Sequence, residues 1–217
     1  MAQLPDVALI ETMLQFIGVF VSFSIAFVAF RGVRKTESSS LLRLATAFAF
    51  LGFGFLVEGA VGLSSLVASA PAVTTVVIAG LLLETTGYFF LAFSHAVDVM
   101  LAKRLGVALL VFPVITLSTA QLANILSILS FYFVLYGVVE TAFSYRRTRR
   151  PDTLLIAVGL SLMGVGTFVQ WLSLLYIQVD VLSLLQIIIR EVGLLILFIP
   201  VLGFGRKGFG VRLDGPI

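Results

Sequence analysis

The sequence predicts an all-α, polytopic integral membrane protein with seven transmembrane helices in a single domain over residues 1–217. Composition is the first reason: 60% of the residues are hydrophobic, 12% are charged and the mean hydropathy is +1.16, whereas soluble domains are roughly 45–50% apolar. The second reason is length, because apolar stretches of roughly 20 residues, enough to cross a bilayer, recur between short polar connections. The third is the alternating placement of the basic residues along the chain.

Charged residues or proline follow each of the first three expected spans. The first gives way to Arg31-Gly-Val-Arg-Lys, the second to Ser69-Ala-Pro71, and the third to Asp98 and Lys103-Arg104. Charged side chains of this kind mark the membrane–water boundary, and proline is disfavoured inside a helix. We therefore expect spans over residues 8–30, 41–67 and 74–97.

Four further spans follow. The fourth is short and contains Pro113, and the fifth stops at the basic run that begins at Arg146. Merging these two spans would give six helices and would place this run and the Arg31 loop on opposite sides of the membrane, which the rule that basic loops stay inside disfavours. The expected spans are residues 105–117, 122–145, 154–176 and 181–204.

The basic residues all lie on one side of the predicted bundle, apart from Arg190 inside the seventh span. Short cytoplasmic loops carry an excess of Lys and Arg, so this distribution predicts an N-terminus outside and a C-terminus inside the cytoplasmic membrane. Of the 14 basic residues, those on alternate connections or in the C-terminal segment are Arg31, Arg34, Lys35, Arg43, Lys103, Arg104, Arg146, Arg147, Arg149, Arg150, Arg206, Lys207 and Arg212.

The two ends of the chain resemble each other. Leu51-Gly-Phe-Gly54 aligns with Met163-Gly-Val-Gly166 at an offset that also sets Glu58 against Gln170. In the third member of each set, Glu84-Thr-Thr-Gly87 aligns with Arg190-Glu-Val-Gly193 when the glycines are superposed. A chance match between hydrophobic helices is the alternative to duplication.

Duplication would give parallel three-helix repeats over residues 8–97 and 122–204, with residues 105–117 as a linker helix. This three-plus-one-plus-three arrangement is similar to that of SWEET-type sugar transporters. The resemblance is one of topology, because the proline-centred signature of that family is missing from spans one and five, and it assigns no residue roles.

Five polar residues fall inside the spans at a similar depth, namely Glu58, Glu84, Gln170, Arg190 and Glu191. Each lies roughly 10–15 Å from the outer end of its span. A charge at the bilayer centre costs about 2.5–3.5 kcal/mol on insertion scales, so Arg190 must meet a carboxylate or water. Two interpretations stay open: a substrate, ion or proton site with Arg190 as counter-ion, or a structural ion-pair network that fixes helix register or docks a partner.

A second polar stripe follows one face of the third span, where Tyr88, His95 and Asp98 share a side with Glu84. As a functional feature it would conduct protons inward, whereas as a structural feature the His and Tyr are simply interfacial. No metal site is expected, because the chain has one His and no Cys and its carboxylates lack the spacing of metal ligands.

The residues predict a protein that is not an enzyme and uses no cofactor. The sequence has no recognisable nucleophile–base pair, phosphate-binding loop or metal cluster, and its small loops argue against nucleic acid as a partner. The leading hypothesis is an accessory or interaction subunit of a larger membrane complex, with the lipid bilayer, other subunits or further copies of itself as partners. The alternatives are a small-solute or proton-coupled transporter with a site in the outer half, and a seven-helix sensor acting through a separate protein. The absence of Cys and the scarcity of Asn suggest the cell membrane of a thermophilic prokaryote.

Overall fold

The computed structural model describes residues 5–67, 73–93, 118–175 and 180–209, and these residues form six α-helices. The all-α class predicted from the sequence is confirmed for this part of the chain. In order, the helices are α1 (Pro5–Thr36), α2 (Ser39–Val67), α3 (Val73–Ala92), α5 (Thr119–Thr148), α6 (Pro151–Leu175) and α7 (Asp180–Phe209).

Five of the described helices are long and apolar enough to cross a membrane, and α3 contributes a shorter apolar stretch over Val76–Ala92. The chain is therefore that of a polytopic membrane protein embedded in the lipid bilayer. Six of the seven expected spans coincide with these helices. The linker span expected over residues 105–117 lies outside the described residues, as do residues 94–97 of the third.

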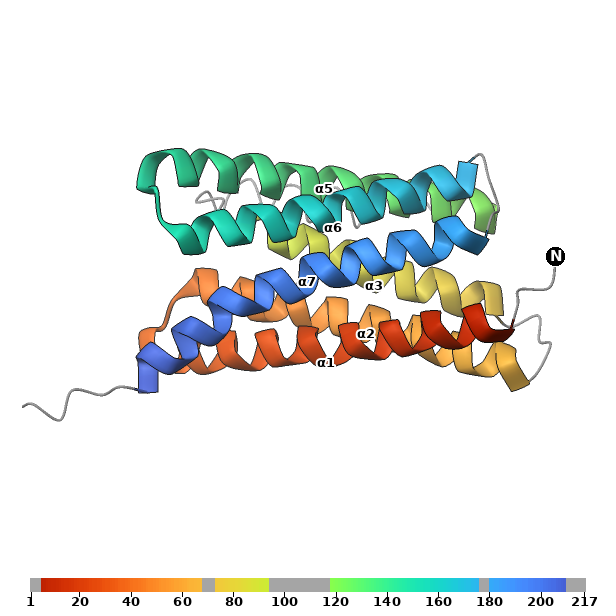
Figure 1. The fold of residues 1–217 in the computed structure, drawn as a ribbon, viewed down its shortest axis with the longest axis horizontal. Coiled ribbons are helices and arrows are strands. Elements are labelled where there is room, and N and C mark those ends of the chain that lie inside the picture. The colour runs from red at the N-terminus through yellow and green to blue at the C-terminus, as the bar shows by residue number, and fades with distance from the viewer. Residues whose placement is uncertain (1–4, 68–72, 94–117, 176–179, 210–217) are drawn as a thin grey trace, which may run out of the picture.

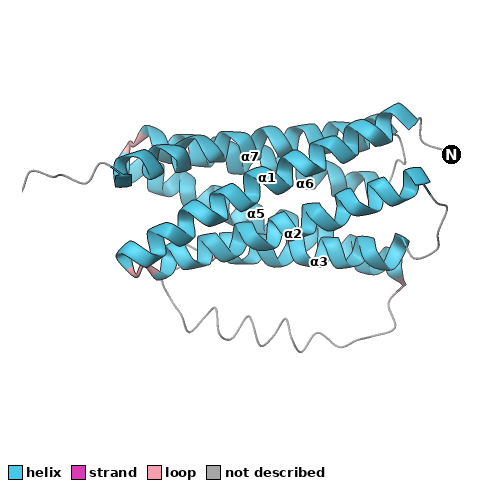
Figure 2. Cartoon of the chain, turned by 90° about the horizontal axis from the view of Figure 1, so that it is seen from below, coloured by secondary structure: helices cyan, strands magenta, loops and turns pink. Residues whose placement is uncertain are grey.

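The six described helices form a closed ring, in which each helix contacts two neighbours (Figures 1 and 2). Going round the ring, α1 contacts α2, α2 contacts α3, α3 contacts α5, α5 contacts α6, α6 contacts α7, and α7 returns to α1. The contacts between α3 and α5 and between α7 and α1 thus join the first three helices to the last three.

Helices α1, α3, α5 and α7 run in one direction and α2 and α6 in the other (Figure 1). The neighbours α3 and α5 are consequently parallel, as are α7 and α1. Each set of three helices follows the same sequence of directions. The N-terminal ends of α1, α3, α5 and α7 share one end of the bundle, which we call the outer end because the sequence predicts an N-terminus outside.

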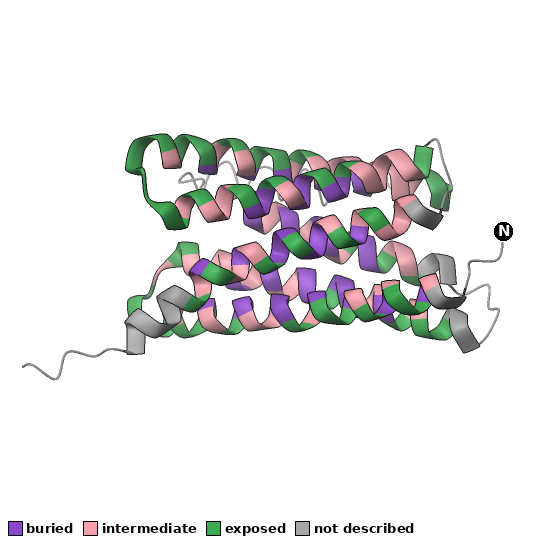
Figure 3. Cartoon of the chain, viewed as in Figure 1, coloured by how far each residue is buried: buried purple, intermediate pink, exposed green. Residues whose placement is uncertain are grey.

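Apolar residues cover both the inside and the outside of the bundle. The fully buried side chains include Ile25, Phe55, Tyr88 and Leu194. Buried residues as a class lie where the helices face one another (Figure 3). Large side chains such as Phe20 are exposed on the outer surface, as expected where lipid replaces water. Hydrophobicity alone therefore does not separate the core from the surface.

Glycines distinguish the core from the surface better, because several of them lie where the backbones of two helices come into contact. A Cβ added at Gly193 on α7 would lie 2.7 Å from the carbonyl oxygen of Gly159 and 2.8 Å from the amide nitrogen of Met163, both on α6. In the other half, a Cβ at Gly87 on α3 would lie 2.9 Å from the carbonyl oxygen of Ala47 on α2. Such close approach is the role of small residues between membrane helices.

Candidate functional site

Four helices place polar side chains at one level of the bundle. Gln15 on α1, Glu58 on α2, Glu84 on α3 and Arg190 on α7 each lie roughly 14–17 Å along the helix from its outer end. The direction of each helix thus brings these groups together, although they are far apart in the sequence.

The guanidinium of Arg190 is the centre of this group. Its Nη1 donates to both carboxylate oxygens of Glu84, at 3.1 and 3.0 Å, and its Nη2 donates to Glu58 Oε2 at 3.2 Å. The side chains of Arg190 and Glu84 are 4% and 2% exposed, whereas that of Glu58 is 14% exposed. The pair formed with Glu84 is therefore the deeper of the two ion pairs.

Gln15 completes the network from α1. Its Oε1 accepts a hydrogen bond from Arg190 Nη2 at 3.0 Å, and its Nε2 donates to Glu58 Oε2 at 2.7 Å. The amide therefore links the cation to one of its anions. Sequence reasoning missed Gln15, although its depth below the outer end of the first span is the same signal that identified the other members.

Glycines and an aromatic ring enclose the ion pair. A Cβ at Gly54 would lie 2.5 Å from Glu84 Cγ, and one at Gly166 would lie 3.0 Å from Arg190 Cβ. The ring of Phe55 lies under the guanidinium, with 4.5 Å between Arg190 Cζ and the ring centroid, a cation–π geometry. Gly54 and Gly166, which correspond in the alignment of the two ends of the chain, thus leave room for the side chains of Glu84 and Arg190.

Glu191 is buried beside this network without joining it. Its side chain faces α1 at Gly18, where an added Cβ would meet Oε1 at 2.6 Å and Oε2 at 2.8 Å. Neither carboxyl oxygen has a hydrogen-bond partner among the described residues. The expected meeting of Arg190 with a carboxylate is thus realised by Glu84 and Glu58.

The other expected site residues divide into two groups. Gln170 lies on α6. This helix contacts the Cβ end of the Arg190 side chain through Gly166, whereas the guanidinium extends away to partners on α1, α2 and α3. Tyr88 is fully buried in the core, one helical turn from Glu84, and its hydroxyl has no hydrogen-bond partner in the described part of the chain. His95 and Asp98 lie outside the described residues.

The network is rich in acid. Glu58 and Glu84 pair with one arginine and Glu191 lies buried beside them, so the site as a whole carries more acidic than basic groups. Within the described ranges, no group of three or more His, Cys, Asp or Glu side chains could hold a metal ion. This arrangement can fix the relative position of four helices, and it can hold a proton.

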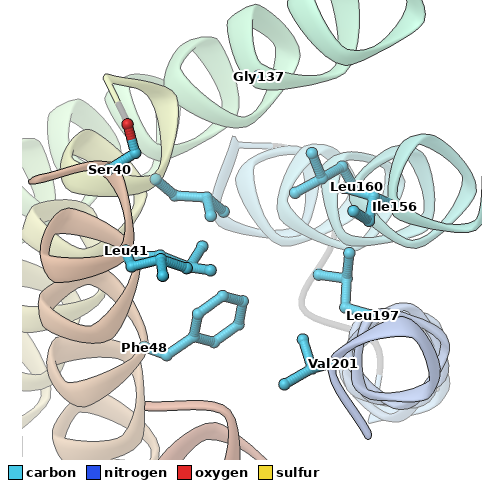
Figure 4. A pocket seen from close by; sticks show the side chains of 10 residues that line it. Ser40, Leu41, Phe48, Gly137, Ile156, Leu160, Leu197 and Val201 are labelled. Carbon is cyan, nitrogen blue, oxygen red and sulfur yellow. The ribbon is translucent and has the colours of Figure 1, made fainter. Parts of the chain in front are cut away.

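A cavity of about 130 Å³ lies between the two halves, farther toward the inner end. Phe48 on α2, Leu160 on α6 and Leu197 on α7 point into it (Figure 4). Its lining is apolar apart from Ser40, and none of the residues of the Arg190 network lines it.

Comparison with protein-family models finds no match to this chain, and comparisons with curated proteins and with solved structures find none either.

Proposed function

We propose that this protein is a non-enzymatic accessory or interaction subunit of a larger membrane complex, in which the Arg190 network keeps the bundle in one arrangement. The observation that carries the proposal is that the Nη groups of Arg190 find their partners within the chain. Glu84, Glu58 and Gln15 accept hydrogen bonds from these groups, and the Phe55 ring covers the face of the guanidinium. Its buried Nε has no hydrogen-bond partner among the described residues.

A buried ion-pair network of this kind opposes movement of one half against the other. Breaking a buried ion pair by removing one partner costs about 3–5 kcal/mol, and sliding α7 past α3 would separate Arg190 from Glu84 in the same way. A transporter that alternates its access around this site would meet this cost in every cycle. A subunit that presents a fixed lipid-facing surface would not.

Purification in mild detergent from the native host tests the proposal. The tagged chain should carry with it other membrane proteins at a fixed ratio, and the ratio should survive a second chromatographic step. A tagged unrelated membrane protein of similar size is the control for non-specific capture. Recovery of the chain alone, or only as copies of itself, would contradict the subunit proposal and favour transport or sensing.

We further propose seven spans, with the N-terminus outside and the C-terminus inside. The parallel direction of α3 and α5 supports this count, because the chain leaves α3 at the inner end and enters α5 at the outer end. An impermeant thiol reagent applied to intact cells should then label a cysteine placed at Ser69 and leave one at Thr148 unlabelled.

The proposed duplication is supported by equivalent contacts in the two halves. Gly54 packs against Glu84, and its aligned partner Gly166 packs against Arg190, which is aligned with Glu84. Gly87 likewise meets the backbone of α2, as the aligned Gly193 meets that of α6. Under this alignment Arg190 and Glu84 are equivalent positions that face each other across the two halves.

Transport is the second candidate, and the cavity of Figure 4 favours it. Three pairs of lining residues are related by the same alignment: Leu44 and Ile156, Phe48 and Leu160, and Leu91 and Leu197. The cavity thus lies where the two proposed repeats meet, which is where binding sites of two-repeat transporters form. Reconstitution in liposomes, with proton and solute flux as readouts, would distinguish the candidates.

A further inference from the structure

Glu191 combines deep burial with an unused carboxyl group. Its exposed fraction is 2%, and neither of its oxygens has a hydrogen-bond partner among the described residues. The opposite surface is the backbone of α1 at Gly18, where the missing side chain leaves just the space that the carboxyl group fills. A membrane-embedded acid of this kind is by default a hypothesis for a functional site.

A negative charge on Glu191 has no direct hydrogen-bond partner among the described residues. Arg190, the neighbouring cation, directs Nη1 to Glu84 and Nη2 to Gln15 and Glu58. The remaining titratable groups near this level are Glu58 on α2 and Glu84 and Tyr88 on α3. Helix α6 carries a single titratable side chain, Asp152 at its inner end, and α1 carries Glu11 nearer the outer end.

An ionised carboxylate without a partner is among the most costly groups to place in hydrocarbon, and it takes up a proton instead. A protonated carboxyl group has one O–H donor and needs only one acceptor. The other half shows the acceptors open to a donor at the equivalent place. The hydroxyl of Thr85, aligned with Glu191, lies 2.7 Å from the carbonyl oxygen of Leu81 in its own helix and 3.3 Å from that of Leu126 in the neighbouring parallel helix.

We propose that Glu191 is a proton-binding site, a carboxylic acid that exchanges its proton with the outer aqueous phase along the interface between α1 and α7. A hydrogen bond between Ser183 and Glu11 lies on this interface, about two helical turns closer to the outer end. This hydrogen bond places polar groups on the same interface, between Glu191 and the outer end of the bundle.

Infrared difference spectroscopy of the full chain in liposomes tests this directly. The wild type at neutral pH should show a carboxylic-acid C=O stretching band that Glu191→Gln removes. The band should shift in D₂O and should decrease as the external pH is raised. Glu140→Gln is the matched control, because Glu140 also has a buried oxygen without a hydrogen-bond partner but lies near the inner end of α5; this change should leave the Glu191 band intact.

Two results would overturn the proposal. One is a wild-type spectrum whose carboxylic-acid bands are all retained in Glu191→Gln, since Glu191 would then be ionised. The other is a Glu191 band that changes neither in D₂O nor with external pH, since the proton would then be trapped. Should Glu191→Gln fail to fold, Gly18→Ala places a methyl group against the carboxyl oxygens and should shift the band. An unshifted band in this variant would count against the site as well.

Discussion

At the scale of single residues, depth in the membrane decides which side chains meet. Arg190 cannot stay alone in hydrocarbon, and the carboxylates of Glu84 and Glu58 lie at its level on two other helices. Arg190 inside a membrane span needs a carboxylate or water beside it, and this need, which is apparent from the sequence, explains the ion pairs. Their cost of desolvation is offset by five hydrogen bonds among four side chains.

Replacing Arg190 by Gln should destabilise the protein by about 3–5 kcal/mol, because two carboxylates then remain buried without their cation. Thermal or denaturant unfolding in a fixed detergent measures the loss. Arg146→Gln removes an exposed arginine at the end of α5 and should change stability by less than about 0.5 kcal/mol. Equal effects of the two changes would show that the Arg190 ion pairs do not stabilise the fold.

The sequence was sufficient to predict that Arg190 meets a carboxylate from a set that includes Glu58, Glu84 and Glu191, but not which of them pair with it or the whole network. Gln15 is harder to identify from the sequence, because placing an uncharged amide in a membrane costs less free energy than placing a charge there. Gln170 was expected at the site because it aligns with Glu58. Gly166 packs against Arg190 Cβ, so α6 lies beside the base of that side chain. The direction in which the guanidinium extends from there cannot be predicted from the sequence pattern.

At the scale of helices, the small residues set how closely the elements pack. The closest contacts of Gly193 are with backbone atoms of α6, and a backbone cannot move aside as a flexible side chain can. In contrast, a Cβ at Gly137 on α5 would come no closer than 3.8 Å to Leu160, which is ordinary van der Waals contact.

Gly193→Ala should therefore destabilise the protein by about 1–3 kcal/mol, because α6 and α7 must separate to admit the methyl group. Gly137→Ala adds the same methyl group at an uncrowded position in another helix and should be neutral or slightly stabilising, since alanine favours helix. Unfolding of both variants under identical conditions compares them. Similar losses would contradict the close contact of α6 and α7.

The positions of the helices followed from hydrophobicity and charge, whereas their ends did not. The span expected over residues 122–145 belongs to a helix that begins at Thr119, because Ser118 and Gln121 form a capping box. That motif is readable in the sequence. The extension of α1 to Thr36 cannot be read from the sequence in this way, because helices continue past the hydrocarbon into the polar interface by lengths that hydropathy does not predict.

At the scale of the whole molecule, the ring of helices consists of two sets of three that meet through parallel neighbours. Thr85 on α3 hydrogen-bonds to Ser130 on α5 at 2.9 Å, and Glu191 on α7 packs on Gly18 of α1. The ion pair between Glu84 and Arg190 lies between these two seams. We propose that this pair joins the two halves and that its members occupy equivalent places in the two repeats.

A double-mutant cycle with exchanged charges tests that claim most directly, with unfolding free energy as the measured quantity. Glu84→Arg and Arg190→Glu should each be strongly destabilising, because each places two like charges together in the bilayer interior. The double variant should regain part of the summed loss, with a coupling free energy of about 2–3 kcal/mol. If the loss in the double variant equals the sum of the single losses within about 0.5 kcal/mol, the two residues neither pair nor occupy equivalent positions.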